Sequence, residues 1–495
     1  MSPKRLACRA LRERKPPALR ARQALACRSS IYDLVISGAT VQTASDSFVA
    51  DIAVSEGRIA ALGECLGPAR QTLDARGLIA LPGGIDAHTH LDMPFADGAT
   101  ADDFKSGTTA AICGGTTTII DFATQTPGQS LRAALNAWQA KAEGRCLTDY
   151  AFHMAITDMN RRTETEMARM AQSGITSFKL YMAYPGRLMS DDAAILRALR
   201  RSNELGALIS LHCENGPAIA ELVRRARAAG HTAPRFHALT RPPAMEEEAV
   251  QRAASLAETA DAPVYIVHLS AAGSLQEVRR ARGRGVSVLA ETCPQYLYLD
   301  ASEYERPGFA SAGCVISPPL RPKGDAEALW QGLSAGEFQA VATDHCSFAL
   351  RSRPGKPGKD LGRKDFSKIP NGAPGIETRM PLMWEAVQKG RLSAARFVEL
   401  TATSPAKVFG LYPRKGHLGP GADADIVLLD PKKRHTIAAR DLHMNVDYNP
   451  FAGITVHGAI KDVFLRGIRM VSEGRLSGQP GTGRFLPRSQ RQFCI

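Results

Sequence analysis

The sequence has no long apolar segment. Nowhere in its 495 residues does an uninterrupted apolar run reach the roughly 18 residues that a membrane-spanning helix requires. The first thirty residues also lack the apolar core and the cleavage site of a secretory signal. With 44% hydrophobic and 22% charged residues, the composition is that of a globular protein. We expect a cytoplasmic protein with no membrane partner.

Cysteine is sparse, and its spacing follows no known framework. The ten cysteines include no CxxC pair and no Cys/His spacing of the zinc-finger type, which excludes a disulfide scaffold and a small zinc module. Several of them, such as Cys113, Cys213 and Cys293, lie in apolar or strand-like runs. We therefore expect small buried thiols in a reducing compartment.

Acidic residues are nearly absent from both ends of the chain. Residues 1–30 contain nine Lys/Arg and one acid, Glu13, and residues 475–495 contain four Arg and no acid. These ends supply +8 and +4 of the net charge of +13, which leaves +1 for residues 31–474. A near-neutral central chain argues against a nucleic-acid partner. We predict a basic, disordered leader at 1–30 and a basic C-terminal tail at 476–495.

A Walker sequence and a glycine-rich phosphate loop are missing as well. The chain instead repeats a short apolar run, a turn and an amphipathic segment of helical period. Strands alternating with helices predict parallel βαβ units, and eight of them predict an α/β fold with a closed (β/α)8 TIM-like barrel, which we place at 77–411. An open doubly wound sheet is the alternative, but it would normally carry a glycine-rich loop after its first strand. The eight runs are 78–90, 116–123, 150–156, 177–184, 207–214, 263–270, 286–293 and 339–346.

The flanking segments have a different pattern. Residues 31–76 and 412–475 consist of short alternating runs joined by glycine-containing turns, which is typical of antiparallel strands. We predict a small β-sandwich domain built from both chain ends beside the barrel. Residues 351–375 are too rich in Gly, Pro and Lys for regular structure, and we expect them to form a long loop over the barrel mouth.

Polar side chains end several of the predicted barrel strands. His88 and His90 form an HxH pair, and side chains two residues apart on a strand point the same way, so both imidazoles could reach one ion. A lone histidine in such a run is more often a hydrogen-bonded core residue. Polar groups at the ends of five strands are harder to explain as packing, and they predict a metal centre at the barrel rim. The remaining candidates are His212, His268 and Asp344 at strand ends, and Lys179 within the fourth run.

Lysine is unusual among metal ligands because an ammonium repels cations and only donates hydrogen bonds. A neutral amine, however, can react with CO2 to form an anionic carbamate whose two oxygens could bridge two ions. Burial shifts the pKa of lysine readily and makes the neutral form accessible. A salt bridge inside the barrel is the alternative for Lys179, and spacing alone leaves both open.

Six motifs occur in the order of one known family. GGIDAHTHLDMPF, GITSFKLYMAY, LHCENG, YIVHLSA, ATDHC and IPNGAPGIE together resemble the dihydropyrimidinase and D-hydantoinase family of cyclic amidohydrolases, and the resemblance runs from about residue 32 to 488. It implies two divalent ions, usually zinc, bridged by a carboxylated lysine. The implied ligands of the first ion are His88, His90, N6-carboxylated Lys179 and Asp344, and those of the second are Lys179, His212 and His268.

The resemblance also implies how a substrate is held. Tyr184 would stabilise the oxyanion, Ser317 and Asn371 would hold the ring amide mainly through backbone groups, and Asp344 would carry the proton. Without the resemblance, the first three would be a core aromatic and two turn residues. The loop at 96–104 departs from the family pattern, which leaves the substrate preference open.

The expected function is therefore a metal-dependent cyclic amidase. It would open dihydropyrimidines or 5-substituted hydantoins to N-carbamoyl amino acids. Allantoinase, dihydroorotase and a non-catalytic scaffold relative are the alternatives, although an occupied position for every ligand argues against the scaffold. The resemblance further implies a homo-oligomer, in particular a tetramer. The preferred ring and enantiomer are not determined by the sequence.

Overall fold

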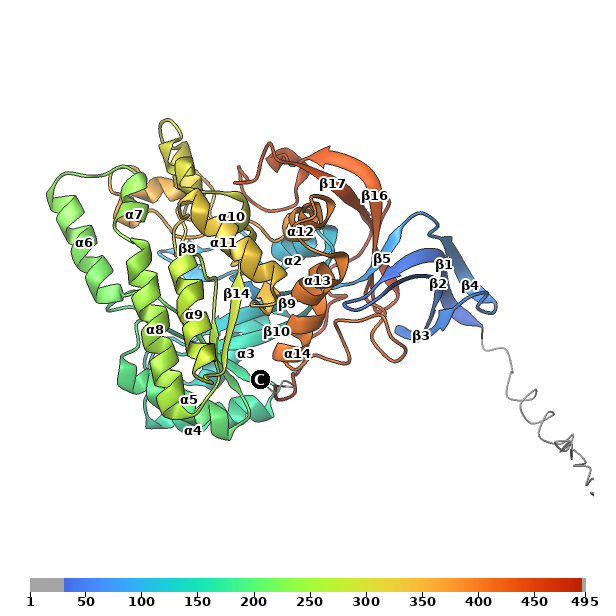
Figure 1. Cartoon of the computed structure of the whole chain (residues 1–495), viewed down its shortest axis with the longest axis horizontal. Coiled ribbons are helices and arrows are strands. Elements are labelled where there is room, and N and C mark those ends of the chain that lie inside the picture. Colours follow the sequence, from blue (N-terminus) through green and yellow to red (C-terminus); the bar gives the residue numbers. More distant parts are fainter. Residues whose placement is uncertain (1–30, 492–495) are drawn as a thin grey trace, which may run out of the picture.

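The structure, a computed structural model, describes residues 31–491 and has two bodies (Figure 1). One is a barrel wrapped in helices, and the other is a separate sheet at one side. The predicted leader at 1–30 lies outside the described residues. None of the helices in the described range is both long and apolar enough to cross a membrane.

The barrel contains eight parallel strands in a single sheet, ordered β6, then β9 to β15. The sheet closes where Thr89 pairs with His345 and where the backbone N–H of Thr343 donates to Asp86 at 3.1 Å. The predicted α/β barrel is thereby confirmed. Its strands are β6 (Gly84–Thr89), β9 (Thr116–Thr124), β10 (Asp149–Ala155), β11 (Ser177–Tyr181), β12 (Leu208–His212), β13 (Val264–Ile266), β14 (Val288–Thr292) and β15 (Ala340–Val341).

Helices between the strands cover the outside of the barrel (Figure 1). In the helix 192–204, for example, Asp191 caps the first turn by accepting from the Ala194 N–H at 2.7 Å, and Ile195, Ala198 and Leu199 form the buried face. The helices are α2 (Phe104–Cys113), α3 (Leu131–Ala142), α4 (Arg161–Gln172), α5 (Asp192–Glu204), α6 (Gly216–Ala228), α7 (Arg235–Leu239), α8 (Pro243–Ala260), α9 (Ala272–Gly283), α10 (Pro294–Tyr298), α11 (Lys323–Ser334), α12 (Arg379–Gln388), α13 (Ala394–Val398) and α14 (Ser404–Val408).

The run 78–90, predicted as one strand, forms two strands in different sheets. β5 (Ile79–Pro82) belongs to the second body, and β6 begins the barrel. The chain changes sheets at Gly83, where a Cβ atom would lie 2.1 Å from the Thr117 hydroxyl oxygen. Glycine has no Cβ atom and therefore fits this close approach at the point where the chain passes from one sheet to the other. Each of the other seven runs overlaps one barrel strand.

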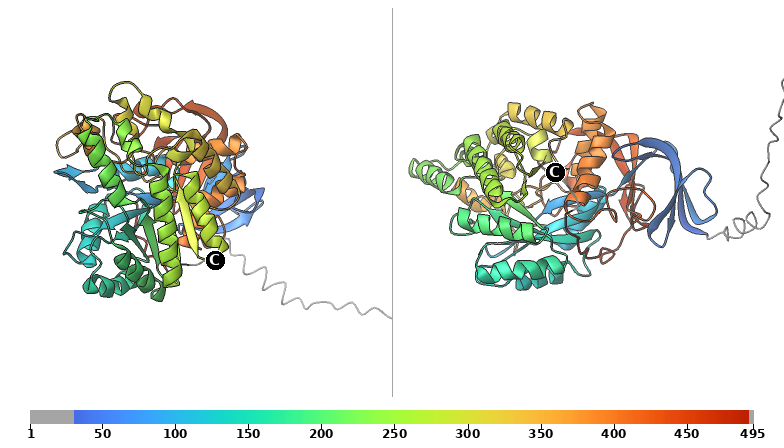
Figure 2. Two further views of the ribbon diagram at one scale, coloured as in Figure 1. Left: turned by 60° about the vertical axis from the view of Figure 1, so that its left-hand side comes forward. Right: turned by 60° about the horizontal axis from the view of Figure 1, so that its bottom comes forward.

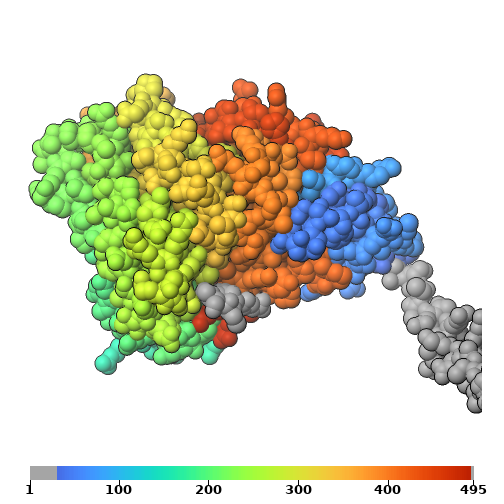
Figure 3. All heavy atoms as spheres, in the orientation of Figure 1, coloured from blue at the N-terminus to red at the C-terminus, as the bar shows by residue number. Residues whose placement is uncertain are grey.

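The second body is built from both chain ends, as predicted. Its nine strands run in the order β19-β18-β17-β16-β5-β1-β2-β3, and β4 pairs with β1. Pairing is mostly antiparallel, and the sheet has its own apolar cluster. Figures 2 and 3 show the N-terminal strands (blue) against the C-terminal part of the chain. The strands besides β5 are β1 (Tyr32–Gln42), β2 (Ser47–Ser55), β3 (Arg58–Gly63), β4 (Ala69–Asp74), β16 (Ile426–Thr436), β17 (Thr455–Leu465), β18 (Ile468–Ser472) and β19 (Arg475–Leu476).

A buried charge cluster joins the two bodies. Lys415 is 2% exposed, and its ammonium contacts Asp149 at the start of β10 and Asp425 just before β16, both at 2.7 Å. Arg466 also pairs with Asp149. Because the partners come from both bodies, these ion pairs fix the small sheet to the barrel.

The last described residues pack against the amino-terminal ends of the barrel strands. Phe485 bridges Tyr150 at the start of β10. The guanidinium of Arg488, a residue only 4% exposed, donates to the Phe152 carbonyl at 2.5 Å and to the Ser177 hydroxyl at 2.8 Å. Residues 485–488 of the basic C-terminal segment therefore cover the amino-terminal end of the barrel and form its floor.

Short helical turns and a hairpin complete the connections. The hairpin consists of β7 (Pro94–Phe95) and β8 (Gly98–Ala99). The segment 351–375, predicted to be irregular, contains two short 3-10 turns and isolated β-bridges but no longer element, and it lies at the barrel mouth. The turns are η1 (Ala301–Glu305), η2 (Ala310–Cys314), η3 (Lys359–Gly362), η4 (Phe366–Lys368), the π-helical η5 (Glu399–Thr403) and η6 (Ala439–Asp441).

Candidate metal centre and pocket

A cavity of about 570 Å³ opens where the barrel strands end at their carboxyl termini. Eight of the nine site residues predicted from the sequence line it, and the ninth, His88, is fully buried beside it. The structure therefore brings the predicted residues together. Those that line the cavity are His90, Lys179, Tyr184, His212, His268, Ser317, Asp344 and Asn371.

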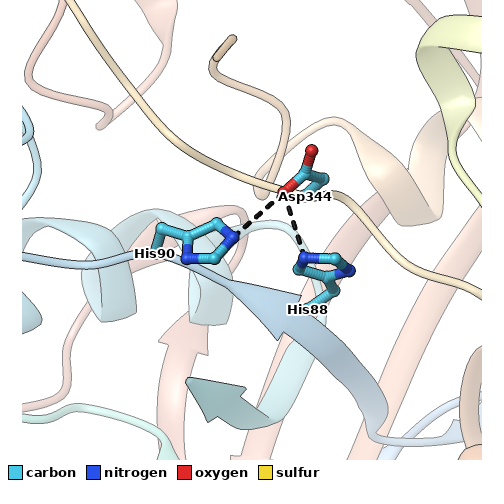
Figure 4. A group of neighbouring side chains, drawn as sticks. All are labelled: His88, His90 and Asp344. Carbon is cyan, nitrogen blue, oxygen red and sulfur yellow. Dashed lines mark ion pairs between the residues drawn. The ribbon is translucent and has the colours of Figure 1, made fainter. Parts of the chain in front are cut away.

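The HxH pair and Asp344 form one compact group (Figure 4). The Nε2 atoms of His88 and His90 lie 3.1 and 3.2 Å from the same carboxylate oxygen of Asp344. His88 is in β6 and His90 directly follows that strand, so both side chains face the neighbouring strand end that carries Asp344. One ligand atom from each residue lies within 4.8 Å of the others, which is the spacing of a metal site.

Lys179 and two further histidines form an adjoining group. The Lys179 Nζ atom, at the middle of β11, lies 2.9 Å from His88 Nε2. His212 at the end of β12 and His268 after β13 face each other, with Nδ1 and Nε2 2.9 Å apart. The rings of His88 and His268 are 5.4 Å apart, so the two groups are neighbours around Lys179.

Burial changes the protonation of Lys179. The residue is 1% exposed, and its Nζ lies 4.3 Å from the centre of the Phe122 ring. Burial lowers the lysine pKa to about 8, although Asp344 and Glu291 act in the opposite direction. A neutral, nucleophilic amine is therefore far more populated near pH 7 than on an exposed lysine.

Two buried carboxylates orient the histidines, and the sequence analysis missed both. Glu291 lies 2.5 Å from His88 Nδ1, and Glu214 lies 2.8 Å from His212 Nε2. A carboxylate that accepts from one ring nitrogen leaves the lone pair of the other nitrogen facing the site. An acid inside the apolar run VSVLAETC could have indicated Glu291, because a buried carboxylate needs a partner.

The donor set fits divalent cations. The Nδ1 atoms of His90 and His268 are buried and have no hydrogen-bond partner among the described residues. Burial lowers the pKa of His90 to about 4 and that of His268 well below its usual value, so both imidazoles are neutral. Burial favours protonation of Asp344, but His88 and His90 hold its pKa well below the usual range. Neutral imidazoles beside an ionised carboxylate are the ligands that zinc binds.

Three of the pocket residues have strained backbones. Tyr184, His268 and Asp344 have φ angles of 66°, 39° and 50°, in the left-handed region that residues with a Cβ atom rarely adopt. Such conformations cost about 1–3 kcal/mol each and cluster at functional sites, where the surrounding structure holds them. The strain therefore supports a functional assignment for this end of the barrel.

One wall of the cavity contains the residues expected to hold a ring amide. The Asn371 side-chain amide donates to the Ser317 hydroxyl at 3.0 Å, which joins segments 54 residues apart. The centres of the Tyr184 and His212 rings lie 5.2 Å apart, so Tyr184 lies between this wall and the histidines. Burial raises the pKa of Tyr184, which keeps the phenol protonated and able to donate.

A buried lysine that sequence reasoning missed holds the same wall. The Lys359 ammonium is fully buried and donates to the carbonyls of Val315, Pro370 and Gly372 at 2.8, 2.7 and 2.6 Å. These carbonyls lie two residues before Ser317 and on either side of Asn371. Lysine in a segment rich in Gly, Pro and Lys gives no signal that it is buried.

The comparisons with known proteins agree with this architecture. The sequence model of the amidohydrolase family matches residues 79–470. A D-hydantoinase of Streptomyces coelicolor is 48% identical over 465 residues, which cover 93% of this chain and 98% of that protein. A D-hydantoinase of Ralstonia pickettii is 45% identical over 456 residues, covering 92% of this chain and 99% of its own.

A solved structure extends the likeness to three dimensions. The crystal structure of dihydropyrimidinase from Brevibacillus agri has a TM-score of 0.91 and is 45% identical, covering 93% of this chain and 99% of that one. Likeness of sequence and structure over nearly the whole chain confirms the resemblance found in the motifs. The chain therefore belongs to the amidohydrolase family and, within it, to the D-hydantoinase and dihydropyrimidinase family.

Proposed function

We propose that the protein is a metal-dependent cyclic amidase that opens the ring of 5-substituted hydantoins or dihydropyrimidines to N-carbamoyl amino acids. One observation carries the proposal: four histidines, a lysine and an aspartate meet at the mouth of a barrel whose sequence is 48% identical to a D-hydantoinase over 465 residues. The amidohydrolase family is metal-dependent, and the His88–His90–Asp344 group has the spacing of a metal site.

The proposed centre holds two divalent cations, and zinc is the metal that we propose for both positions. His88, His90 and Asp344 would bind the first, and His212 and His268 the second. The Lys179 amine would add to CO2 and lose a proton, and the resulting carbamate would supply anionic oxygen ligands to both cations. The short Lys179–His88 distance of 2.9 Å and the buried, partly neutral amine support this assignment.

The cations and the side chains of the protein would contribute different steps of the ring opening. Bound together, the two cations would favour ionisation of water and polarise the ring carbonyl. The Tyr184 phenol donates to the carbonyl oxygen as negative charge develops on it. The Asp344 carboxylate accepts the proton of the attacking water and passes it to the ring nitrogen as the C–N bond breaks. Ser317 and Asn371 hold the remaining ring amide.

The test is turnover of a substrate panel by the zinc-loaded protein. The panel contains 5-monosubstituted hydantoins of both enantiomers, dihydrouracil, dihydrothymine, allantoin and dihydroorotate, and the N-carbamoyl product is quantified by chromatography. We expect ring opening of hydantoins or dihydropyrimidines. Hydrolysis of allantoin or dihydroorotate alone would assign the protein to one of the alternative activities. A folded protein that retains no metal would favour the scaffold alternative.

The homotetrameric state and cytoplasmic location remain predictions. Large apolar side chains on the small sheet support self-association, since Phe48, Val49 and Ile468 are 41%, 65% and 51% exposed. Light scattering coupled to size exclusion measures the mass of the assembly directly, and a monomer at micromolar concentration would contradict the oligomer prediction.

A further inference from the structure

A second group of metal-ligand side chains lies outside the cavity. Cys113 is the last residue of α2, Glu377 lies two residues before α12, and His443 lies between η6 and β17. The three come from distant parts of the sequence. One ligand atom from each residue lies within 4.8 Å of the other two, and none of the three lines the catalytic cavity.

His443 is fixed by Glu377 and directed at the cysteine. One carboxylate oxygen of Glu377 lies 2.8 Å from His443 Nδ1, and the other accepts from the His443 backbone N–H at 2.7 Å. The remaining ring nitrogen, Nε2, lies 3.8 Å from Cys113 Sγ. This is the arrangement in which a carboxylate sets the tautomer of a metal-binding imidazole.

The spacing of sulfur and nitrogen suits a tetrahedral ion. Bonds of about 2.3 Å to sulfur and about 2.0 Å to nitrogen place the two atoms about 3.5 Å apart. The observed 3.8 Å between Cys113 and His443 needs an adjustment of only a few tenths of an ångström. Zinc and related thiophilic ions prefer this combination of thiolate and imidazole.

The electrostatic surroundings also favour a cation. Glu377 is 7% exposed, so its charge is poorly solvated, and Cys113 lies at the C-terminal end of α2, where the helix dipole is negative. The same position disfavours an isolated thiolate, which argues against a reactive nucleophile.

We propose that Cys113 and His443, with Glu377 holding the imidazole, form a second site for a thiophilic divalent ion of the zinc type. Metal binding displaces the thiol proton of Cys113 and the proton on His443 Nε2. Water completes the coordination, because the His443 side chain is 38% exposed and lines a hollow of about 350 Å³. An ion there joins α2, the segment before α12 and the loop before β17.

Cobalt is the probe, because a thiolate bound to Co²⁺ gives a near-ultraviolet charge-transfer band. None of the proposed catalytic ligands is a cysteine, and substitution of Cys113 distinguishes this band from one due to Cys346, which lines the catalytic cavity. The full-length protein is freed of metal with a chelator and then titrated with Co²⁺, because zinc bound beforehand would occupy the second site as well. We expect a band that grows with added Co²⁺ and saturates at the intensity of one cobalt–thiolate site per chain.

Variants separate the site from other thiols. Cys113→Ser should abolish the band, whereas Cys65→Ser, at an exposed cysteine, should keep it. Glu377→Gln should weaken Co²⁺ binding by about 10–100-fold, the effect of losing a carboxylate behind a ligand histidine. Hydantoin turnover by the zinc-loaded variants verifies that they are folded. His443→Gln provides a second route if Cys113→Ser does not fold, and it should weaken binding at least as much.

Two results would overturn the proposal. One is the absence of a thiolate band in the wild-type protein at saturating Co²⁺. The other is a band that persists in Cys113→Ser or is unchanged in His443→Gln, because the absorbing thiolate would then lie elsewhere.

Discussion

Replacing Lys359 by methionine tests whether a residue remote from the proposed chemistry positions the substrate. The substitution keeps a long unbranched side chain and removes the ammonium that donates to the carbonyls of Val315, Pro370 and Gly372. Those carbonyls flank Ser317 and Asn371. The backbone around these two residues should therefore become less ordered, although no residue that contacts the substrate is replaced.

The size of the effect follows from two opposing contributions. A hydrogen bond that involves a charged group is worth about 1.5–3 kcal/mol net, and Lys359 makes three. Burial of the ammonium is unfavourable, and it lowers the lysine pKa to about 7. The substitution leaves three buried carbonyls without this donor, and we therefore expect a net loss of about 3 kcal/mol. If all of it falls on substrate binding, affinity drops about 100-fold, since about 1.4 kcal/mol is tenfold.

Steady-state kinetics on the preferred cyclic amide, with metal content measured on the same samples, is the assay. We expect KM to rise between about tenfold and 100-fold in Lys359→Met, kcat to change less, and bound metal to stay constant. Lys364→Met, at an exposed lysine of the same segment, is the matched control and should behave as wild type. Unchanged KM in Lys359→Met, or a loss of activity explained entirely by lost metal, would refute the reasoning.

Four further substitutions test the proposed centre and the contact between the two bodies. Tyr184→Phe should lower kcat by about 10²–10³-fold with little change in KM, the effect of removing one oxyanion donor, and equal kcat would exclude that role. Glu291→Gln should weaken metal retention at the catalytic centre by about 10–100-fold on dialysis, because His88 loses its orienting carboxylate. Lys179→Ala should be inactive and partly recover with a short carboxylic acid that replaces the carbamate; full activity without it would exclude a bridging lysine. Lys415→Met should lower the free energy of unfolding in urea by about 3–5 kcal/mol, since it leaves buried carboxylates such as Asp149 with less compensation.

The barrel and its candidate ligands were predictable because their signals are local. Each strand is a short apolar run, and each ligand stands in or at the end of such a run, where the fold places functional groups. The orientation of His88 and His90 was predictable for the same reason, because the two-residue repeat of a strand directs both side chains to one side.

The supporting groups were not predictable, since each depends on contacts between distant segments. Glu291 meets His88 across 203 residues, and Lys359 finds its carbonyl acceptors only after the mouth segment has folded over Val315. Neither residue type nor spacing encodes such a pairing. The change of sheets at Gly83 was hidden for a related reason, because the close neighbour of this glycine, Thr117, lies on another strand.

The position of Arg488 has a consequence for biosynthesis. Its guanidinium bonds to β10 and to the first residue of β11, more than 300 residues earlier in the chain. The small sheet likewise needs β16 before β5 has both of its neighbouring strands. The ribosome must therefore release almost the whole polypeptide before either body can be completed. During translation the early strands therefore have unpaired edges. A tag fused close behind residue 491 would lie beside the C-terminal segment that completes the barrel.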